Sequence, residues 1–490
     1  MSAEVLWMIA KALDDPADLH HLLHVNRRLF RIAAPLRYAS IHFDTYLTLC
    51  RAAPMYTIAQ DADRSAIYHS APRRVDIGGP ADGRQWGFER TFKVLRTLTA
   101  VRSLHIWNLP SFSYDRLAHW VSNMETLETL EVVSPATRDF MPRYHTPALP
   151  ATFPSLTRVH FLNFQWSTIE STLDQSLSSL ALLSLLSTIR SFCADVKSWI
   201  SMSRGRWCER LSFPPNVTEL EILVGSECNM RDMQDEAWAR GLFRALRVCG
   251  DKLESLRVQL PYQTRTVLDS RISLSRLAVF VGPEGLIRSM DLHGPLTVLW
   301  ITSCAVDAEP DVAPWVSVWP TLHNPSTLRM LRVASWDIRT LDLTDVYSNL
   351  PELEELSIFT KIRLTKEELV SFGDAFRRCP RLWNVTILGP SGAMQPQKEV
   401  AGIASAWHKV APNLGSIRLS TSEKWHLQYD WDDQKFVWDS KSVTFSRGYK
   451  QVDLPKRLKP CSLLVPPYSP NLRARYPDSD TEYETGSESE

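Results

Sequence analysis

The segment Leu127-Glu128-Thr129-Leu130-Glu131-Val132 contains the pattern that decides the fold of this chain. Apolar residues occupy its first, fourth and sixth positions, and the other three positions are polar. Because alternate residues of a strand point to opposite faces, Leu130 and Val132 share one face and Glu131 lies on the other. The segment therefore predicts a short strand with one buried face and one polar face.

The same pattern, with Leu, Ile, Val or Phe at the apolar positions, recurs through most of the chain. The copy at Leu127 begins 26 residues after its predecessor, and the copy at Leu382 begins 29 residues after its own. Clear copies begin at Val101, Leu127, Leu156, Val217, Leu253, Leu296, Leu328, Leu353, Leu382 and Leu414. Weaker candidates at Leu274 and at residues 189–192 fill two wide gaps. The sequence resembles long leucine-rich repeats, whose units each contribute a strand and a helix.

Proline residues support this division into repeats. Each of five prolines lies two residues before the first apolar position of a copy, where it ends a helix ahead of a strand. They are Pro154, Pro215, Pro351, Pro380 and Pro412. The segments 115–124 and 366–378, which lie between copies, have the apolar spacing of helices. We therefore expect an α/β fold, with an irregular leucine-rich-repeat solenoid shaped like a horseshoe over residues 94–424. A different solenoid or a layered α/β protein is the alternative.

The first forty residues follow a helical pattern instead. Val5, Leu6, Ile9 and Leu13 recur at offsets of three and four, which predicts one apolar stripe on a helix. The segment Asp14-Asp15-Pro16 predicts a turn, because proline lacks an N–H and restricts the residue before it. A second helix is expected from Pro16 or Asp18, and Pro35 is expected to mark its end or the end of a third. Three such short helices must pack on something else to be stable.

This N-terminal pattern resembles the F-box motif. The resemblance rests on Glu4, the stripe of the first helix, the turn at residues 14–19, and the segment from Val25 to Phe30. The run Pro35-Leu36-Arg37-Tyr38-Ala39-Ser40-Ile41 is similar to the end of the box in divergent fungal-type members. The family usually has Leu-Pro before the acidic residue, where this chain has Ser2-Ala3. A helical cap over the first repeat is the alternative.

The F-box resemblance implies a docking partner. That partner would be the Skp-type adaptor of cullin ubiquitin ligases, and through it a cullin. The implied adaptor-binding residues are Val5, Leu6, Ile9, Leu13, Pro16, Leu19, Val25 and Leu29. By the same resemblance, the chain would be the substrate-recognition subunit of the ligase. A leucine-rich scaffold without a ubiquitin role is the alternative function, and an enzyme with an unrecognised site is a third.

The polar face of the predicted strands is the expected substrate surface. The residue between the second and third apolar positions of each copy points to the concave face. These residues are Glu131, His160, Glu221, Arg257, Trp300, Arg332, Ser357, Thr386 and Arg418. Because Trp and Arg contribute strongly to protein interfaces, we expect Arg257, Trp300 and Arg332 to bind a protein substrate. A solvated face is the simpler alternative for each residue.

Composition fits an interaction protein of the cytoplasm or nucleus. The 55 basic and 55 acidic side chains balance, which argues against a nucleic-acid surface. The start of the sequence has no signal-peptide pattern, and the apolar segment 173–189 is too short and polar to span a membrane. The 8 cysteines form no Cys-x-x-Cys pair, which favours reduced thiols. We therefore expect no nucleic-acid or membrane partner.

Common enzyme motifs are absent from the sequence. There is no phosphate-binding glycine loop, nucleophile elbow, zinc-protease helix or dinucleotide fingerprint. We assign no catalytic residue, cofactor or metal ligand.

The remaining segments complete the expected domain organisation. Apolar alternation around Trp425 and Phe436 predicts a hairpin cap over residues 425–450. Residues 451–490 become Pro-rich and then acidic, which predicts a disordered tail. The expected domains are the F-box-like motif at 1–41, a linker or cap at 42–93, the solenoid at 94–424, the hairpin at 425–450, and the tail at 451–490.

Overall fold

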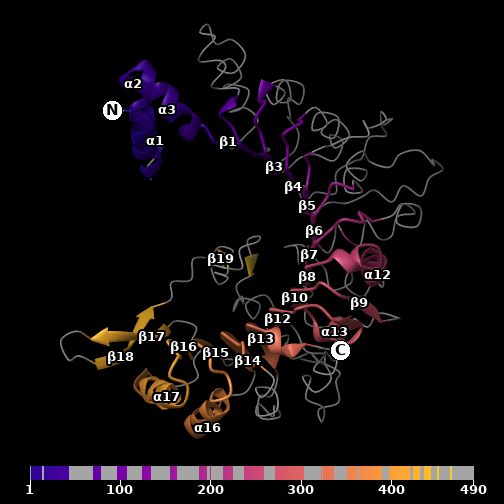
Figure 1. The fold of residues 1–490 in the computed structure, drawn as a ribbon, viewed down its shortest axis with the longest axis vertical. Coiled ribbons are helices and arrows are strands. Elements are labelled where there is room, and N and C mark those ends of the chain that lie inside the picture. The colour runs from indigo at the N-terminus through magenta and orange to yellow at the C-terminus, as the bar shows by residue number, and fades with distance from the viewer. Residues whose placement is uncertain are drawn as a thin grey trace, which may run out of the picture.

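The computed structural model describes residues 2–13, 16–43, 70–78, 97–107, 124–133, 155–162, 187–195, 199, 213–223, 237–258, 271–302, 322, 324–335, 350–360, 364–388, 397–419, 423–430, 435–442, 450–451 and 464–465. Its largest element is one open, 16-stranded sheet that runs from β1 to β18. The strands follow one another along a curved path (Figure 1). This long parallel sheet is consistent with a repeat solenoid.

Three helices form at the N-terminus, as the sequence predicted. They are α1 (Ala3–Ala12), α2 (Pro16–Val25) and α3 (Arg27–Arg37). The Ser2 hydroxyl accepts a hydrogen bond from the Val5 amide at 3.3 Å, and the Asn26 side chain accepts one from the Leu29 amide at 2.9 Å. These contacts satisfy amides that a helix start leaves without partners. Pro35 lies inside the last turn of α3 rather than at its end.

Fourteen parallel strands form the body of the sheet. They are β1 (Ser40–Phe43), β2 (Arg74–Gly78), β3 (Ser103–Trp107), β4 (Thr129–Val133), β5 (Arg158–Leu162), β6 (Ser191–Asp195), β7 (Glu219–Leu223), β8 (Ser255–Val258), β10 (Val279–Gly282), β12 (Val298–Ile301), β13 (Met330–Ser335), β14 (Glu355–Thr360), β15 (Asn384–Leu388) and β16 (Ser416–Arg418). Every clear copy of the repeat pattern supplies one of them.

The sheet begins earlier than the expected start at residue 94. Strands β1 and β2 pair in parallel with one another, and β2 pairs with β3. Their copies of the pattern place Tyr38 and Pro72 at the first apolar position, where the other copies have Leu, Val or Ile. The weak candidate at residues 189–192 forms β6. The weak candidate at Leu274 has the wrong register. The copy that forms β10 (Val279–Gly282) begins at Leu277 instead.

A C-terminal hairpin forms over residues 423–442, within and just before the segment 425–450 where the sequence placed it. Strand β17 (Glu423–Asp430) pairs antiparallel with β16 and with β18 (Lys435–Ser442). Two further pairs lie outside the main sheet. These are β9 (Ile272–Leu274) with β11 (Met290–Leu292), and β19 (Lys450–Gln451) with β20 (Leu464–Val465).

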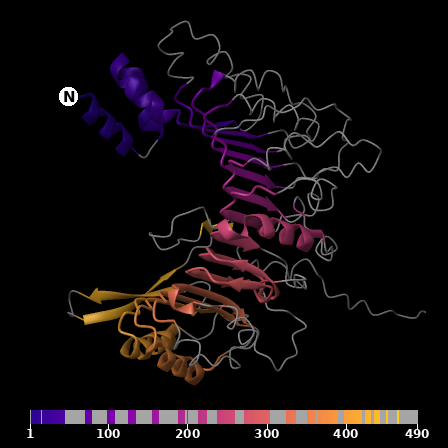
Figure 2. The ribbon, with the colours of Figure 1, turned by 45° about the vertical axis from the view of Figure 1, so that its right-hand side comes forward.

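The main core follows one face of the sheet along its whole length, and the described outer helices cover that face over its C-terminal half (Figures 1 and 2). Alternate strand residues such as Leu130 and Val132 are fully buried there. The outer elements are α12 (Ala237–Cys249), η2 (Gly250–Lys252), α13 (Glu284–Arg288), η4 (Pro325–Thr327), α16 (Lys366–Phe376) and α17 (Gln397–Val410). Helix α16 confirms the prediction for residues 366–378, although it ends two residues early. The expected helix at 115–124, the apolar segment up to residue 186 and the acidic tail beyond Val465 lie outside the described residues.

A repeated backbone contact fixes the start of each strand. The carbonyl of Arg73 accepts hydrogen bonds from the successive amides of Arg102 and Ser103, at 2.8 and 2.9 Å. The carbonyl of Arg102 then accepts from Glu128 and Thr129. The series continues from β1 to β16 through the carbonyls of Ala39, Arg73, Arg102, Glu128, Thr157, Arg190, Thr218, Glu254, Ala278, Thr297, Arg329, Glu354 and Trp383. This carbonyl chain aligns the strands and sets their register.

Candidate functional site

The strand register places the predicted inner-face residues in one row. Each residue of the row is the direct partner of the next across the sheet. From β1 to β16 the inner row is His42, Asp76, His105, Glu131, His160, Cys193, Glu221, Arg257, Val281, Trp300, Arg332, Ser357, Thr386 and Arg418. Sequence reasoning missed His42 and Asp76 because it missed their strands. It also omitted His105, which sits in a recognised copy.

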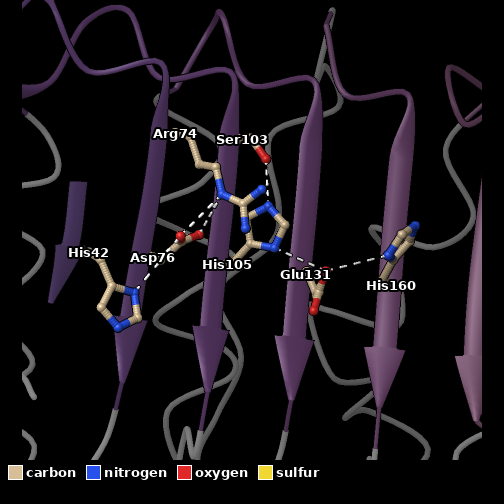
Figure 3. Close-up of polar contacts among 7 residues, drawn as sticks. All are labelled: His42, Arg74, Asp76, Ser103, His105, Glu131 and His160. Atoms are coloured by element: carbon tan, nitrogen blue, oxygen red, sulfur yellow. Dashed lines mark hydrogen bonds and ion pairs between the residues drawn. The ribbon is translucent and has the colours of Figure 1, made fainter. Parts of the chain in front are cut away.

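Histidines and carboxylates alternate at the N-terminal end of the inner row (Figure 3). Arg74 Nε lies 2.9 Å from Asp76 Oδ1, and His42 Nδ1 lies 3.9 Å from Asp76 Oδ2. His105 Nδ1 donates to Glu131 Oε2 at 3.0 Å, and His160 Nδ1 lies 3.6 Å from the same oxygen. Glu131 therefore joins three adjacent strands through side-chain contacts.

These contacts change the acidity of Glu131. Burial raises the pKa of its carboxyl, but the hydrogen bonds and charges of His105 and His160 lower it further than burial raises it. The pKa of Glu131 is therefore held well below its ordinary value of 4.5. A carboxylate in such a setting stays charged through the physiological range.

The contacts of His105 have the order of a serine-hydrolase triad. The Ser103 hydroxyl lies 2.7 Å from His105 Nε2, and Glu131 accepts from the other ring nitrogen. Acyl transfer also needs donors for the developing oxyanion. Strand β3 lies between β2 and β4, so its amides are used in the sheet. Within the described residues, these contacts join Ser103 and His105 of β3 to Glu131 of β4.

Glu131→Gln should lower the free energy of unfolding by about 1–3 kcal/mol at pH 7, because it removes a half-buried, charged acceptor from two histidines. The lowered pKa means that the wild-type advantage is present above pH 4.5 and shrinks as the pH falls below it. Urea unfolding of both proteins between pH 3 and pH 7 measures this difference. Glu128→Gln, which alters the more exposed pair with Arg102, is the control and should change little. Equal losses for both variants would contradict the expectation.

The middle of the inner row changes from acidic to basic. Arg257 is buried and lies 4.0 Å from Glu221. Burial raises the pKa of Glu221 above its ordinary value, although the charges of Arg257 and His160 act in the opposite direction. Cys193 is also buried there, and burial together with Glu221 and Glu131 raises the pKa of its thiol. A thiol held protonated in this way is a poor nucleophile.

The C-terminal half of the inner row combines an aromatic ring with arginines. The Arg332 guanidinium lies 5.3 Å from the centre of the Trp300 ring and 3.7 Å from Glu355. Burial lowers the pKa of Arg332, and Glu355 opposes that shift. Burial also lowers the pKa of Arg418. Thus the predicted residues Trp300 and Arg332 are in contact, whereas Arg257 lies across β10 from Trp300.

A small apolar cluster fills the space around Trp300 on β10, β12 and β13. It is separate from the main core and contains Val279, Val281, Val298 and Met330, with Ala278 and Trp300 packed against it. The C-terminal half therefore presents charged and apolar groups side by side.

A second candidate surface is the apolar face of α1. The exposed fraction is 39% for Val5, 57% for Met8 and 47% for Ile9, and these residues are spaced three and four apart. Only Ala10 of α1 is buried, and Trp7 is exposed beside Lys11. Sequence reasoning predicted Val5 and Ile9 but not Met8 or Trp7.

The other predicted adaptor-binding residues are distributed differently. Leu6, Leu13 and Leu29 are half-buried, and Val25 is exposed. Leu19 packs against the small core of α2 and α3, which contains Leu23, Phe30, Ala33 and Ala34. The Pro16 side chain lies outside the described residues. The predicted set is therefore divided between an exposed helix face and an internal core.

Three further observations limit the chemistry of the described parts of the chain. They contain no group of His, Cys, Asp or Glu side chains that could hold a metal ion. Cys193, Cys249 and Cys379 are buried and form no disulfide, and burial raises the pKa of Cys249 and Cys379 to about 12. Where helices are described, none has the length and apolar character needed to cross a bilayer.

No protein-family model and no curated protein matches the chain. Among solved structures, the chain is similar to the leucine-rich repeat-containing protein LegL7 from Legionella pneumophila. The two are 12% identical with a TM-score of 0.29, and the match covers 71% of this chain and 93% of that one.

Proposed function

We propose that this protein is the substrate-recognition subunit of a Skp–cullin–F-box type ubiquitin ligase in the cytoplasm or nucleus. Its α1–α3 segment would be an F-box-like motif that binds the Skp-type adaptor. Its sheet would belong to a divergent leucine-rich-repeat solenoid that binds a protein substrate. Catalysis would belong to other subunits.

The observation that carries the proposal is the exposed apolar face of α1. Helices α2 and α3 share a small core, whereas α1 leaves Val5, Met8 and Ile9 exposed. A helix cap that served only the first repeat would bury its apolar stripe against that repeat. Large apolar side chains exposed together on one helix are typical of a protein-binding face. The F-box resemblance includes Val5 and Ile9, and it implies the adaptor as the partner.

The adaptor contact can be tested with purified proteins. The full chain should bind the Skp-type adaptor, and the double variant Met8→Asp, Ile9→Asp should bind at least about a hundredfold more weakly, because it places two charges in an apolar interface. Calorimetry or surface plasmon resonance measures both affinities. Both side chains are exposed, so the variant should keep the wild-type unfolding midpoint.

Val370→Asp on α16 is the matched control. Val370 is 39% exposed, like Val5, but it lies at the other end of the sheet. Its substitution should leave adaptor binding unchanged. If the folded full chain fails to bind the adaptor, the ligase role is wrong and a scaffold without a ubiquitin role replaces it.

A further inference from the structure

The inner row is basic over its C-terminal half. From β8 to β16 its charged members are Arg257, Arg332 and Arg418, and its other members are uncharged. Glu355 lies on the same face, two residues before Ser357, and offsets part of this charge. The described part of this half therefore favours an anionic ligand.

Two arginines of this half, Arg257 and Arg332, each have a buried Nε atom with no hydrogen-bond partner among the described residues. The contacts of Arg257 with Glu221 and of Arg332 with Glu355 are single ion pairs at 4.0 and 3.7 Å. A guanidinium has five donors and can bind a carboxylate through two of them. Burial penalises the charged form of Arg332, and an arriving carboxylate would offset this penalty.

The apolar cluster around Trp300 adds a second requirement. A ligand that covers this cluster gains from apolar or aromatic side chains as well as from negative charge. An acidic peptide that contains an aromatic residue meets both requirements.

The chain carries such a segment at its own C-terminus. Residues 478–490 contain no Lys or Arg and have Tyr483 near their middle. Their acidic residues are Asp478, Asp480, Glu482, Glu484, Glu488 and Glu490. The sheet from β8 to β16 is roughly 30 Å wide at a strand spacing of about 4.8 Å. The sequence that follows β18 can extend on the order of 150 Å, so it can reach this face.

We propose that residues 478–490 bind the inner face over Arg257, Trp300 and Arg332 of the same chain. The acidic carboxylates would pair with the arginines, and Tyr483 would cover the apolar cluster beside Trp300. If the proposed substrate role is correct, the segment competes with substrates for this face. The binding itself does not depend on that role.

A labelled synthetic peptide of residues 476–490 tests the proposal by fluorescence anisotropy. A chain that ends at residue 465 should bind the peptide, and the affinity should fall at least about tenfold between 50 and 300 mM NaCl. The full chain should bind the peptide at least about tenfold more weakly, because its own segment occupies the site at high effective concentration. A peptide with Asn and Gln in place of Asp and Glu should not bind.

The double variant Arg257→Gln, Arg332→Gln locates the contact. In the shortened chain it should weaken peptide binding by at least about tenfold, since it removes two charge-assisted contacts. Arg158→Gln is the matched control, because Arg158 lies on the same face at β5 and outside the basic half. It should leave the affinity unchanged. The unfolding midpoint of each variant shows whether it is folded.

Several results would overturn the proposal. These are no binding of the acidic peptide to the shortened chain, equal binding to the full chain, or equal losses for the two arginine variants. Adaptor binding by the same shortened chain is measured in parallel. If it persists while peptide binding fails, the tail inference is wrong and the ligase proposal stands. The opposite result would leave the tail contact and remove the ligase role.

Discussion

Trp407→Ala should lower the free energy of unfolding by about 3–5 kcal/mol, because it removes a large buried side chain and leaves a cavity. Trp407 of α17 is fully buried, and its ring packs edge-on against Phe376 of α16 with 5.1 Å between ring centres. Its Nε1 also donates to the Leu369 carbonyl at 2.7 Å. The substitution therefore removes both of these contacts between the two helices. Chemical denaturation measures the loss.

Trp383→Ala is the control for this effect. Trp383 is 40% exposed and precedes β15, close to the same helices in the sequence. Loss of the Trp383 side chain should lower the free energy of unfolding by less than about 1 kcal/mol. If the two variants unfold at the same denaturant concentration, Trp407 does not hold the helices together.

Gly294→Ala should lower the free energy of unfolding by about 3 kcal/mol. This is the upper end of the usual cost of adding atoms to a packed interior. A Cβ atom at Gly294 would lie 2.5 Å from the Leu277 nitrogen and 2.7 Å from the Leu277 oxygen. Both atoms are backbone, so a change of side-chain rotamer cannot relieve the contact. Leu277 leads into β10, and Gly294 leads into β12. We expect a lower thermal midpoint and faster amide exchange in these two strands.

Gly402→Ala tests whether the effect comes from crowding. Gly402 lies inside α17, and a Cβ atom there would have nothing within 4 Å. Alanine favours a helix over glycine by about 0.5–1 kcal/mol, so this variant should be slightly more stable than the wild type. A loss of stability for Gly402→Ala that matched the loss for Gly294→Ala would contradict the crowding explanation.

The sequence predicted the strands well where all three apolar positions were filled by aliphatic or phenylalanine residues. It failed where another residue took one position. Pro72 stands at the first position of the copy that forms β2, and Gly282 stands at the third position of the copy that forms β10. The backbone contact between adjacent strands tolerates these residues, because it uses carbonyls and amides rather than side chains.

The sequence predicted which face of the sheet the candidate residues lie on, but not which side chains touch one another. Alternation along a strand placed Glu131 and Arg332 on the inner face. The pairing of Glu131 with His105 and His160 depends on the register of three strands that are far apart in the sequence. The exposure of Met8 depends on which side of α1 packs against α3, and an isolated amphipathic pattern does not determine this.

The carbonyl chain from Ala39 to Trp383 has a mechanical consequence. Each of its carbonyls ties one strand to the next, and none of these bonds skips a strand. A linear array of this kind shortens by one unit when it frays at an end. A break near β8 instead divides it into two arrays, each with a newly exposed edge that can pair with other chains. A break in strand pairing at the centre of the sheet should therefore promote association with other chains more than an equal break at either end.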